Sequence, residues 1–226
     1  MGKFITYSVN SGLYNMNFDN NILEESIKNG TKEPVLRFYG WSPACISLGR
    51  NQIDNIDYSV CKENNIDVVR RATGGRALLH DKELTYSFVC PVSFLDAKES
   101  VSLSYKEISG ALVLGMKELG IDVGFPENKK IKTQPQYCMS LSTGADLSYK
   151  NKKIIGSAQV RKSGYILQHG AILIDVDFEL IKKLFHENTF SHEITFLKEI
   201  NCNISLEELI YGIKKGFESK FNQKFI

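Results

Sequence analysis

The sequence lacks the long apolar runs of a membrane protein. None of its hydrophobic stretches approaches the roughly 20 residues that are needed to cross a bilayer. Its first residues, MGKFITYSV, also lack the apolar core of a secretory signal peptide. With 42% hydrophobic and 24% charged residues, the composition is that of an ordinary soluble globular protein. We therefore expect a cytoplasmic protein that does not bind a membrane.

The sequence also lacks an excess of charge of either sign. Lys and Arg together number 28 and Asp and Glu number 26, which gives a formal net charge of +2. Domains that bind nucleic acid are typically strongly basic, so this balance gives no reason to expect a nucleic-acid partner. It leaves room for a local basic patch that faces an acidic protein.

The sequence lacks a regular pattern of cysteines. The five cysteines are odd in number and form no CxxC pair, which argues against a disulfide framework and against a zinc site. No GxGxxG or Walker pattern occurs, so the sequence predicts neither a dinucleotide site nor a P-loop. We expect reduced thiols, no metal and no bound cofactor.

The arrangement of helical and strand patterns favours the α+β class. The 226 residues can form one domain with a sizeable core, and no repeat or linker divides them, so a single domain over residues 1–226 is predicted. Strands in adjacent hairpins, with helices between groups of strands, argue against a doubly wound sheet. Helices are predicted at 16–30, 98–120 and 205–221, the last with a capping box of Ser205 and Glu208. Strands are predicted at 34–41, 44–50, three within 66–92, and a meander of 145–149, 152–161 and 164–174. Lys150-Asn151 and Ser163-Gly164 supply the turns of the meander.

The segment RRATGGRALLHDKELTYS, residues 70–87, combines adjacent glycines with several positive charges. Gly74 and Gly75 tolerate positive φ and close approach of a ligand, so consecutive N–H groups can form an anion-binding nest. The charged side chains around them are Arg70, Arg71 and Arg76, followed by His80 and Asp81. A plain hairpin turn with a basic rim fits the same spacing, and the residues alone do not decide between the two.

Cys138 lies in a loop of polar and conformationally special residues, TQPQYCMSLSTG. Free cysteines are usually buried, and Cys61 and Cys90, within apolar helical and strand patterns, are predicted to be core thiols. A loop cysteine beside a cation is where a reactive thiolate is expected. Cys138 is therefore the candidate nucleophile, and one more buried thiol is the alternative.

Lys153 is the candidate cation next to Cys138. Strict alternation along the strand after the Lys150-Asn151 turn places Lys153 and Lys152 on opposite faces. With Lys153 lie Ile155, Ser157, Gln159 and Arg161, and with Lys152 lie Ile154, Gly156, Ala158 and Val160. Lys153 thus shares a face with the polar residues of the strand. A solvated lysine beside a hairpin turn is the alternative and the commoner situation.

The histidines give one further candidate. His169, next to Gly170 on the third strand of the meander, could line the same site. His186 and His192 are six residues apart, which fits no metal-ligand spacing, and are predicted to lie on the surface.

Three longer motifs resemble a known family. LRFYGWSPACISLGRNQ, RRATGGRALLHDKELTYS and KKIIGSAQVRKSGYILQHGAILI are similar to the biotin/lipoate protein ligase superfamily, and within it most to the octanoyltransferases of the LipM type. The resemblance runs from about residue 16 to residue 174. It implies a biotin/lipoate ligase-like catalytic domain, with a mixed, mostly antiparallel sheet flanked by helices. ATP-dependent lipoate ligases usually carry an SGGGAV-like run where this sequence has TGGRAL.

The resemblance also implies an activity. Members of that family transfer an octanoyl group from acyl carrier protein, through a cysteine thioester, to a lysine of a lipoyl domain such as the glycine cleavage H protein or a dehydrogenase E2 subunit. Their cysteine precedes the site lysine by the interval between Cys138 and Lys153, so these roles carry onto Cys138 and Lys153. The substrate-binding residues that the motifs imply are Arg71, Thr73, Gly74, Gly75, Arg76, His80, Ser157, Ala158, Gln159, His169 and Gly170. Both partners are acidic, so the arginines would steer their docking, and a monomer is expected.

Three other activities remain open at the level of sequence. In an ATP-dependent lipoate or octanoate ligase, Lys153 would contact an acyl-adenylate and Cys138 would have no role. An octanoyl amidotransferase between lipoyl proteins would use the same cysteine chemistry and differ in its donor. A non-catalytic acyl-binding relative would bind octanoate without forming a covalent adduct.

Overall fold

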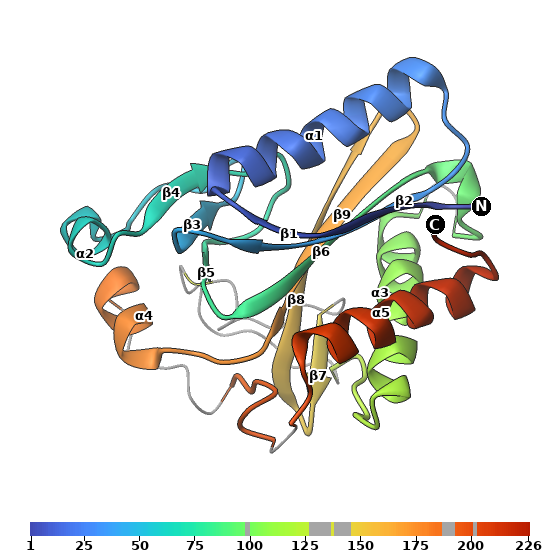
Figure 1. The fold of residues 1–226 in the computed structure, drawn as a ribbon. Helices are drawn as coiled ribbons and strands as arrows, with labels where there is room; N and C mark the ends of the chain where they lie inside the picture. The colour runs from blue at the N-terminus through green and yellow to red at the C-terminus, as the bar shows by residue number, and fades with distance from the viewer. Residues whose placement is uncertain (98–99, 127–136, 138–145, 187–192, 201–202) are drawn as a thin grey trace.

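A six-stranded mixed sheet is the centre of the fold in the computed structural model, which describes residues 1–97, 100–126, 137, 146–186, 193–200 and 203–226 (Figure 1). The strand order is β1-β2-β6-β9-β8-β7; β1 and β2 are parallel and the other neighbours are antiparallel. The strands are β1 (Lys3–Asn10), β2 (Val35–Trp41), β6 (Glu83–Pro91), β7 (Leu147–Tyr149), β8 (Lys152–Lys162) and β9 (Tyr165–Leu173). The predicted α+β class with a mostly antiparallel sheet is confirmed.

A second, three-stranded sheet has the order β4-β3-β5, in which β3 is parallel to β4 and antiparallel to β5. Its strands are β3 (Cys45–Leu48), β4 (Asp67–Arg70) and β5 (Leu78–His80), and α2 (Tyr58–Glu63) and α4 (Phe178–Phe185) lie at this end of the molecule (Figure 1). Since β4 and β5 both pair with β3 and not with each other, the glycine segment between them is not a hairpin turn. That alternative is wrong.

Helices cover both faces of the main sheet (Figure 1). The helix α1 (Gly12–Asn29) lies on one face, and α3 (Val101–Glu118) and α5 (Leu206–Phe221) lie on the other. A short 3-10 helix, η1 (Val92–Phe94), lies between β6 and α3 in the chain. The alternation of β2 explains both contacts: Leu36 and Phe38 join the core under α3 and α5, whereas Val35 packs with Leu23 of α1. No helix in the described part of the chain is long and apolar enough to cross a membrane.

Local signals set most element ends. The two turns of the meander have φ of 47° and 64° at Lys150 and Asn151, and of 47° and 78° at Ser163 and Gly164. These are the paired positive φ values of a two-residue hairpin, as predicted. The capping box of α5 also forms as predicted. The predicted start of the first helix was four residues late, because Ser11 caps it with its hydroxyl, which accepts the N–H of Tyr14.

The three cysteines in the described residues are all buried free thiols. Cys61 and Cys90 are core residues as predicted, and Cys45 is buried as well. Burial raises the pKa of all three thiols, that of Cys45 to about 12. His186 is on the surface as predicted, whereas Cys202 and His192 lie outside the described residues.

Candidate active site

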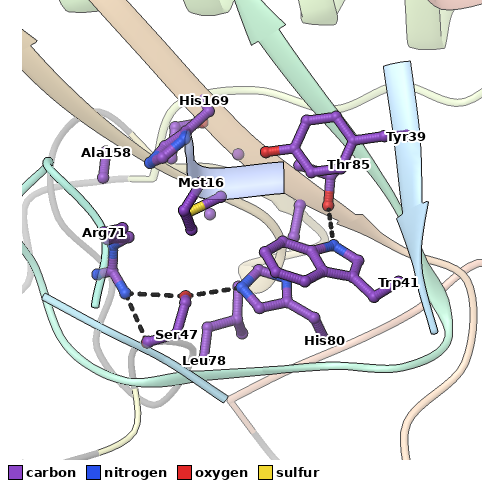
Figure 2. Close-up of a pocket in the computed structure, with 14 residues that line it drawn as sticks. Met16, Tyr39, Trp41, Ser47, Arg71, Leu78, His80, Thr85, Ala158 and His169 are labelled. Carbon is purple, nitrogen blue, oxygen red and sulfur yellow. Dashed lines mark hydrogen bonds between the residues drawn. The ribbon is translucent and has the colours of Figure 1, made fainter. Parts of the chain in front are cut away.

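A mainly apolar pocket lies between the two sheets and α1 (Figure 2). Its floor is one row of the main sheet, in which Tyr39 pairs with Thr85, Thr85 with Ala171, and Ala171 with Gly156. The other lining residues that matter here are Met16 of α1, Trp41 of β2, Ser47 of β3, Arg71, Leu78, His80, Ser157, Ala158, His169 and Gly170. Two elements far apart in the sequence, α1 and the β8–β9 hairpin, thus meet at this pocket.

Arg71 organises the glycine segment. Its buried guanidinium donates to the carbonyl oxygens of Gly74 at 2.8 Å and Arg76 at 2.7 Å. It also donates to Ser47 on β3, at 2.7 Å to the carbonyl and 3.1 Å to the hydroxyl oxygen. Because C=O and N–H point in opposite directions across a planar trans peptide, the N–H of Gly75 is directed away from Arg71. Gly75 has φ of +91°, a conformation that favours glycine.

The loop after β3 holds the same segment from its other side. The N–H of Arg50 donates to the carbonyl of Thr73 at 2.9 Å. Gly49 lies so close that a Cβ there would be 1.9 Å from the carbonyl oxygen of Gly75. Arg70 in turn donates to the carbonyl of Gly49 at 2.6 Å. The backbone of the segment is therefore fixed by contacts with β3 and the loop that follows it.

A buried chain of hydrogen bonds joins α1, the main sheet and the glycine segment. His169 places Nε2 2.7 Å from the hydroxyl of Thr73 and Nδ1 3.2 Å from a carboxylate oxygen of Asp19. Asp19 also pairs with Arg37 at 2.7 Å and accepts the hydroxyl of Tyr39 at 2.8 Å. Burial lowers the pKa of His169, an effect that Asp19 opposes, so the ring is neutral at pH 7. Since an ionised carboxylate only accepts, Nδ1 carries the proton and Nε2 accepts from Thr73.

A second chain runs along the opposite wall of the pocket. The indole N–H of Trp41 donates to Thr85 at 2.8 Å, and Thr85 donates to Glu83 at 2.6 Å. His80 bridges Glu83 at 2.5 Å and the hydroxyl of Ser47 at 2.7 Å, and its ring stacks on Trp41 with centroids 3.9 Å apart. These polar atoms bind one another, so the wall presents mainly hydrocarbon to the interior.

Lys153 is a buried cation and not a solvated one. Its side chain is 2% exposed and its Nζ lies 3.0 Å from Oδ2 of Asp146, which is equally buried. Its backbone bonds to both neighbours of Ile194, with N–H donating to Glu193 and C=O accepting from Thr195. A buried charge requires such a partner, because desolvating an unpaired ion is costly. The alternative of a surface lysine is therefore wrong.

A β-bulge decides which face of β8 carries Lys153. Leu147 pairs with Ile155 and Ser148 with Lys153, so β8 has one extra residue here. Ile154 and Ile155 both enter the core under α3 and α5, and the alternation shifts by one residue. On the shifted register, Lys153 shares the face of Gly156 and Ala158. Its predicted grouping with Ser157, Gln159 and Arg161 is wrong, because strict alternation takes no account of a bulge.

Cys138 lies outside the described residues. Tyr137, the residue before it in the sequence, is 1% exposed and forms a β-bridge with Ala77, next to the glycine segment. The ring of Tyr137 also packs on Phe185, with centroids 5.0 Å apart. The chain is thus anchored beside the glycine segment immediately before Cys138.

Comparison with known proteins places this arrangement in a family. The sequence profile described as the lipoyl protein ligase A/B catalytic domain matches residues 11–218. The chain belongs to this family. Among curated proteins, octanoyltransferase LipM of Carboxydothermus hydrogenoformans is 37% identical over 97% of this chain and 87% of its own length. Octanoyltransferase LipM of Clostridioides difficile is 38% identical over 95% of this chain and 85% of its own length.

Solved structures agree on the fold. The T. acidophilum protein Ta0514 with bound lipoic acid has a TM-score of 0.79 and 22% identity, over 100% of this chain and 87% of that one. Lipoate-protein ligase A bound with ATP has a TM-score of 0.81, 22% identity and the same coverage. The lipoate/biotin ligase-like fold expected from the motifs is confirmed.

Most of the predicted residues meet at the pocket of this lipoyl ligase A/B domain. Lining it are Arg71, His80, Ser157, Ala158, His169 and Gly170, and beside it lie Thr73, Gly74, Gly75 and Arg76. Gln159 does not line it: its amide donates to Gln168 at 2.9 Å, in the layer between β8 and α3. The hydroxyl of Ser157 likewise turns to this layer, where it accepts from Tyr86 at 2.8 Å.

Several residues of the site were not found from the sequence: Met16, Trp41 and Ser47 line the pocket, and Asp19 and Glu83 hydrogen-bond to its two histidines. A signal existed for Asp19, because it lies on the same helical stripe as the buried Ile22 and Leu23. A carboxylate in a buried stripe is rare unless it is paired, so its position indicates a partner. The others depend on contacts between segments that no local pattern shows.

The site combines three chemical features. These are an apolar pocket, a glycine segment in which the N–H of Gly75 is directed away from Arg71, and the buried ammonium group of Lys153 on β8, a strand that also lines the pocket. Among the described residues, no three His, Cys, Asp or Glu side chains are placed to hold a metal ion. The arrangement suits a ligand with an apolar chain and a polar, reactive head group.

Proposed function

We propose that this protein is an octanoyltransferase of lipoate biosynthesis, which moves an octanoyl group from acyl carrier protein to a lysine of a lipoyl-domain protein. The observation that carries the proposal is its similarity to octanoyltransferases LipM, at 37% and 38% identity over nearly the whole chain. The apolar pocket supports it, because each buried methylene of an acyl chain contributes about 0.8 kcal/mol.

Cys138 is the proposed nucleophile of a two-step transfer. Its thiolate attacks the thioester carbonyl of the donor, a new C–S bond forms, and the C–S bond to the carrier's phosphopantetheine breaks. The released thiolate takes up a proton. The lysine amine of the acceptor then attacks the acyl-enzyme, loses a proton, and displaces the Cys138 thiolate as the amide forms. One thioester replaces another and is then converted to a more stable amide, so no ATP is required.

Lys153 is proposed to stabilise the thiolate and to exchange the proton with the incoming amine. Its burial supports this role, because charges interact more strongly where water is excluded. The anchoring of Tyr137 beside Ala77 supports the assignment of Cys138, which follows it. The N–H of Gly75 is the proposed donor to the oxyanion, a contribution of about 3–4 kcal/mol for one well-placed donor.

Of the three arginines in the glycine segment, we propose that Arg76 alone contacts a partner. Arg70 and Arg71 donate to backbone carbonyls, so they support the loop. Arg76 is half-exposed on the rim, and we propose that it faces the phosphate of the carrier's prosthetic group. The acceptor would be a lipoyl domain such as that of the glycine cleavage H protein or a dehydrogenase E2 subunit.

The test is an intact-mass measurement after incubation with octanoyl-acyl carrier protein in the absence of ATP. One octanoyl increment that maps to Cys138, is labile to hydroxylamine and is absent from Cys138→Ser is the expected result. The buried Cys90→Ser is the matched control and should still be acylated. Labelling of a lipoyl domain only when ATP and free octanoate are supplied would replace the proposal with a ligase mechanism.

A further inference from the structure

The floor of the pocket becomes bulkier from β8 toward β2. Its four residues form one row, paired from strand to strand in the order Gly156, Ala171, Thr85 and Tyr39. Their side chains grow in the same order, from a hydrogen atom through a methyl group and a threonine side chain to a phenol ring. The pocket therefore becomes shallower across the sheet in the direction of β2.

The β8 end of the pocket reaches the surface. Ser157 and Ala158 on β8 are half-exposed and both line the pocket. Lys153 lies on the same strand, three residues before Gly156. A bound acyl chain therefore has its reactive head at β8, near the proposed catalytic lysine, and its tail points toward β2.

The β2 end is closed by a buried cluster. Tyr39, Trp41 and Cys45 pack together there and are 0%, 7% and 0% exposed. Met16 of α1 packs against this cluster, and Figure 2 shows its side chain over the pocket, in the space between His169 and Trp41. The tail of a bound chain consequently meets these side chains.

Met16 differs from its neighbours at the closed end, because hydrogen bonds hold the two rings. The hydroxyl of Tyr39 donates to Asp19 and the indole N–H of Trp41 donates to Thr85, each at 2.8 Å. Methionine is unbranched and adaptable, and Met16 is only half-buried. Its size can therefore change the depth of the pocket without breaking the hydrogen-bonded wall.

The dimensions suit an eight-carbon chain. Three strand spacings separate Gly156 from Tyr39, which is about 14 Å. An extended chain with C–C bonds of about 1.5 Å advances roughly 1.3 Å per bond, so an octanoyl group spans roughly 9 Å. A chain that starts over Gly156 thus ends near Thr85, in front of Tyr39 and Met16.

We infer that Met16 is the specificity-determining residue for acyl chain length, an inference that rests on the proposed octanoyl transfer. Shortening Met16 lengthens the pocket and admits further methylenes, and enlarging it excludes the terminal carbons of octanoate. Each methylene that gains or loses burial changes affinity roughly fourfold, so two carbons change it roughly 15-fold.

The test is a titration with hexanoic, octanoic and decanoic acid, followed by the fluorescence of Trp41. The sequence contains one tryptophan, and it lines the pocket, so its emission reports occupancy directly. Met16→Ala should raise the ratio of decanoate to octanoate affinity roughly tenfold or more, and Met16→Phe should shift preference toward hexanoate. Leu13→Ala is the matched control on the same helix, since Leu13 is 64% exposed, and should keep the wild-type ratios.

Two results would overturn the inference. One is unchanged length preference in both Met16 variants, and the other is the absence of any Trp41 response to these acids in the wild-type protein. Failure of the proposed transfer is distinguishable, because it would leave length-dependent binding intact while no octanoyl group reached Cys138 or a lipoyl domain.

Discussion

Replacing Arg71 with lysine tests how the glycine segment is held. Toward the described residues, the arginine fork makes four hydrogen bonds, to the carbonyls of Gly74, Arg76 and Ser47 and to the hydroxyl of Ser47. A lysine keeps the charge but presents one nitrogen on a flexible stem, which cannot span acceptors on two segments. Arg71→Lys therefore keeps the positive charge and removes the forked arrangement of hydrogen-bond donors.

The expected effect on stability follows from the lost hydrogen bonds. If lysine keeps two of the four, two buried acceptors lose a charged donor, at a cost of about 3 kcal/mol in unfolding free energy. For a chain of this size, that corresponds to a melting temperature lower by about 6–12 °C. Thermal unfolding followed by circular dichroism measures the shift.

The expected effect on transfer follows from the N–H of Gly75. Its orientation depends on the carbonyl of Gly74 facing Arg71, and a misplaced oxyanion donor lowers kcat by roughly 100-fold. Arg50→Lys is the control, because Arg50 is a neighbouring exposed arginine that contacts the segment through its backbone N–H, and its substitution should change the melting temperature little. A variant Arg71→Lys that melts and transfers octanoyl like the wild-type protein would refute this account of the segment.

Two further predictions concern buried titratable groups. Lys153→Met should lower the unfolding free energy by about 3–5 kcal/mol, since the buried carboxylate of Asp146 loses its ammonium partner. The double variant Lys153→Met with Asp146→Leu should recover part of that stability without recovering octanoyl transfer. Denaturant titration and a transfer assay on the two variants check this, and restored activity in the double variant would exclude a catalytic lysine. Burial lowers the pKa of His169 from its ordinary 6.5, so below that pH the unfolded chain takes up a proton that the folded chain does not. Unfolding free energy should therefore fall from pH 7 toward pH 5, by at most about 1.4 kcal/mol per pH unit, and His169→Asn should show a smaller slope; equal slopes would contradict the neutral, buried ring.

Local signals allowed much of the fold to be predicted. The two hairpin turns and the cap of α5 depend on backbone conformations and side chains within a few residues of each other. The edge strand β1 was not predicted, because it is held by parallel pairing with β2, some 30 residues away. The helix α4 was not predicted either, although its buried Ile181, Leu184 and Phe185 follow a helical period.

The candidate site was predicted less completely than the fold. The motifs led to Arg71, His80 and His169, which do meet at the pocket. They gave no indication that Arg71 serves the loop backbone, because its hydrogen bonds reach β3, more than 20 residues earlier. The face of Lys153 could not be derived from alternation, since one extra residue in the bulge reverses it.

The sequence by itself determined the family, the turns and the caps, and it supplied the candidate site residues, because these depend on residue type and short spacing. Only the tertiary structure decided which of those side chains share a cavity. The pocket row crosses four strands in the order β8-β9-β6-β2, and its closed end is covered by Met16 from a helix that precedes all of them. Such a surface arises from strand register and helix packing, which are set by the whole core and not by any one segment.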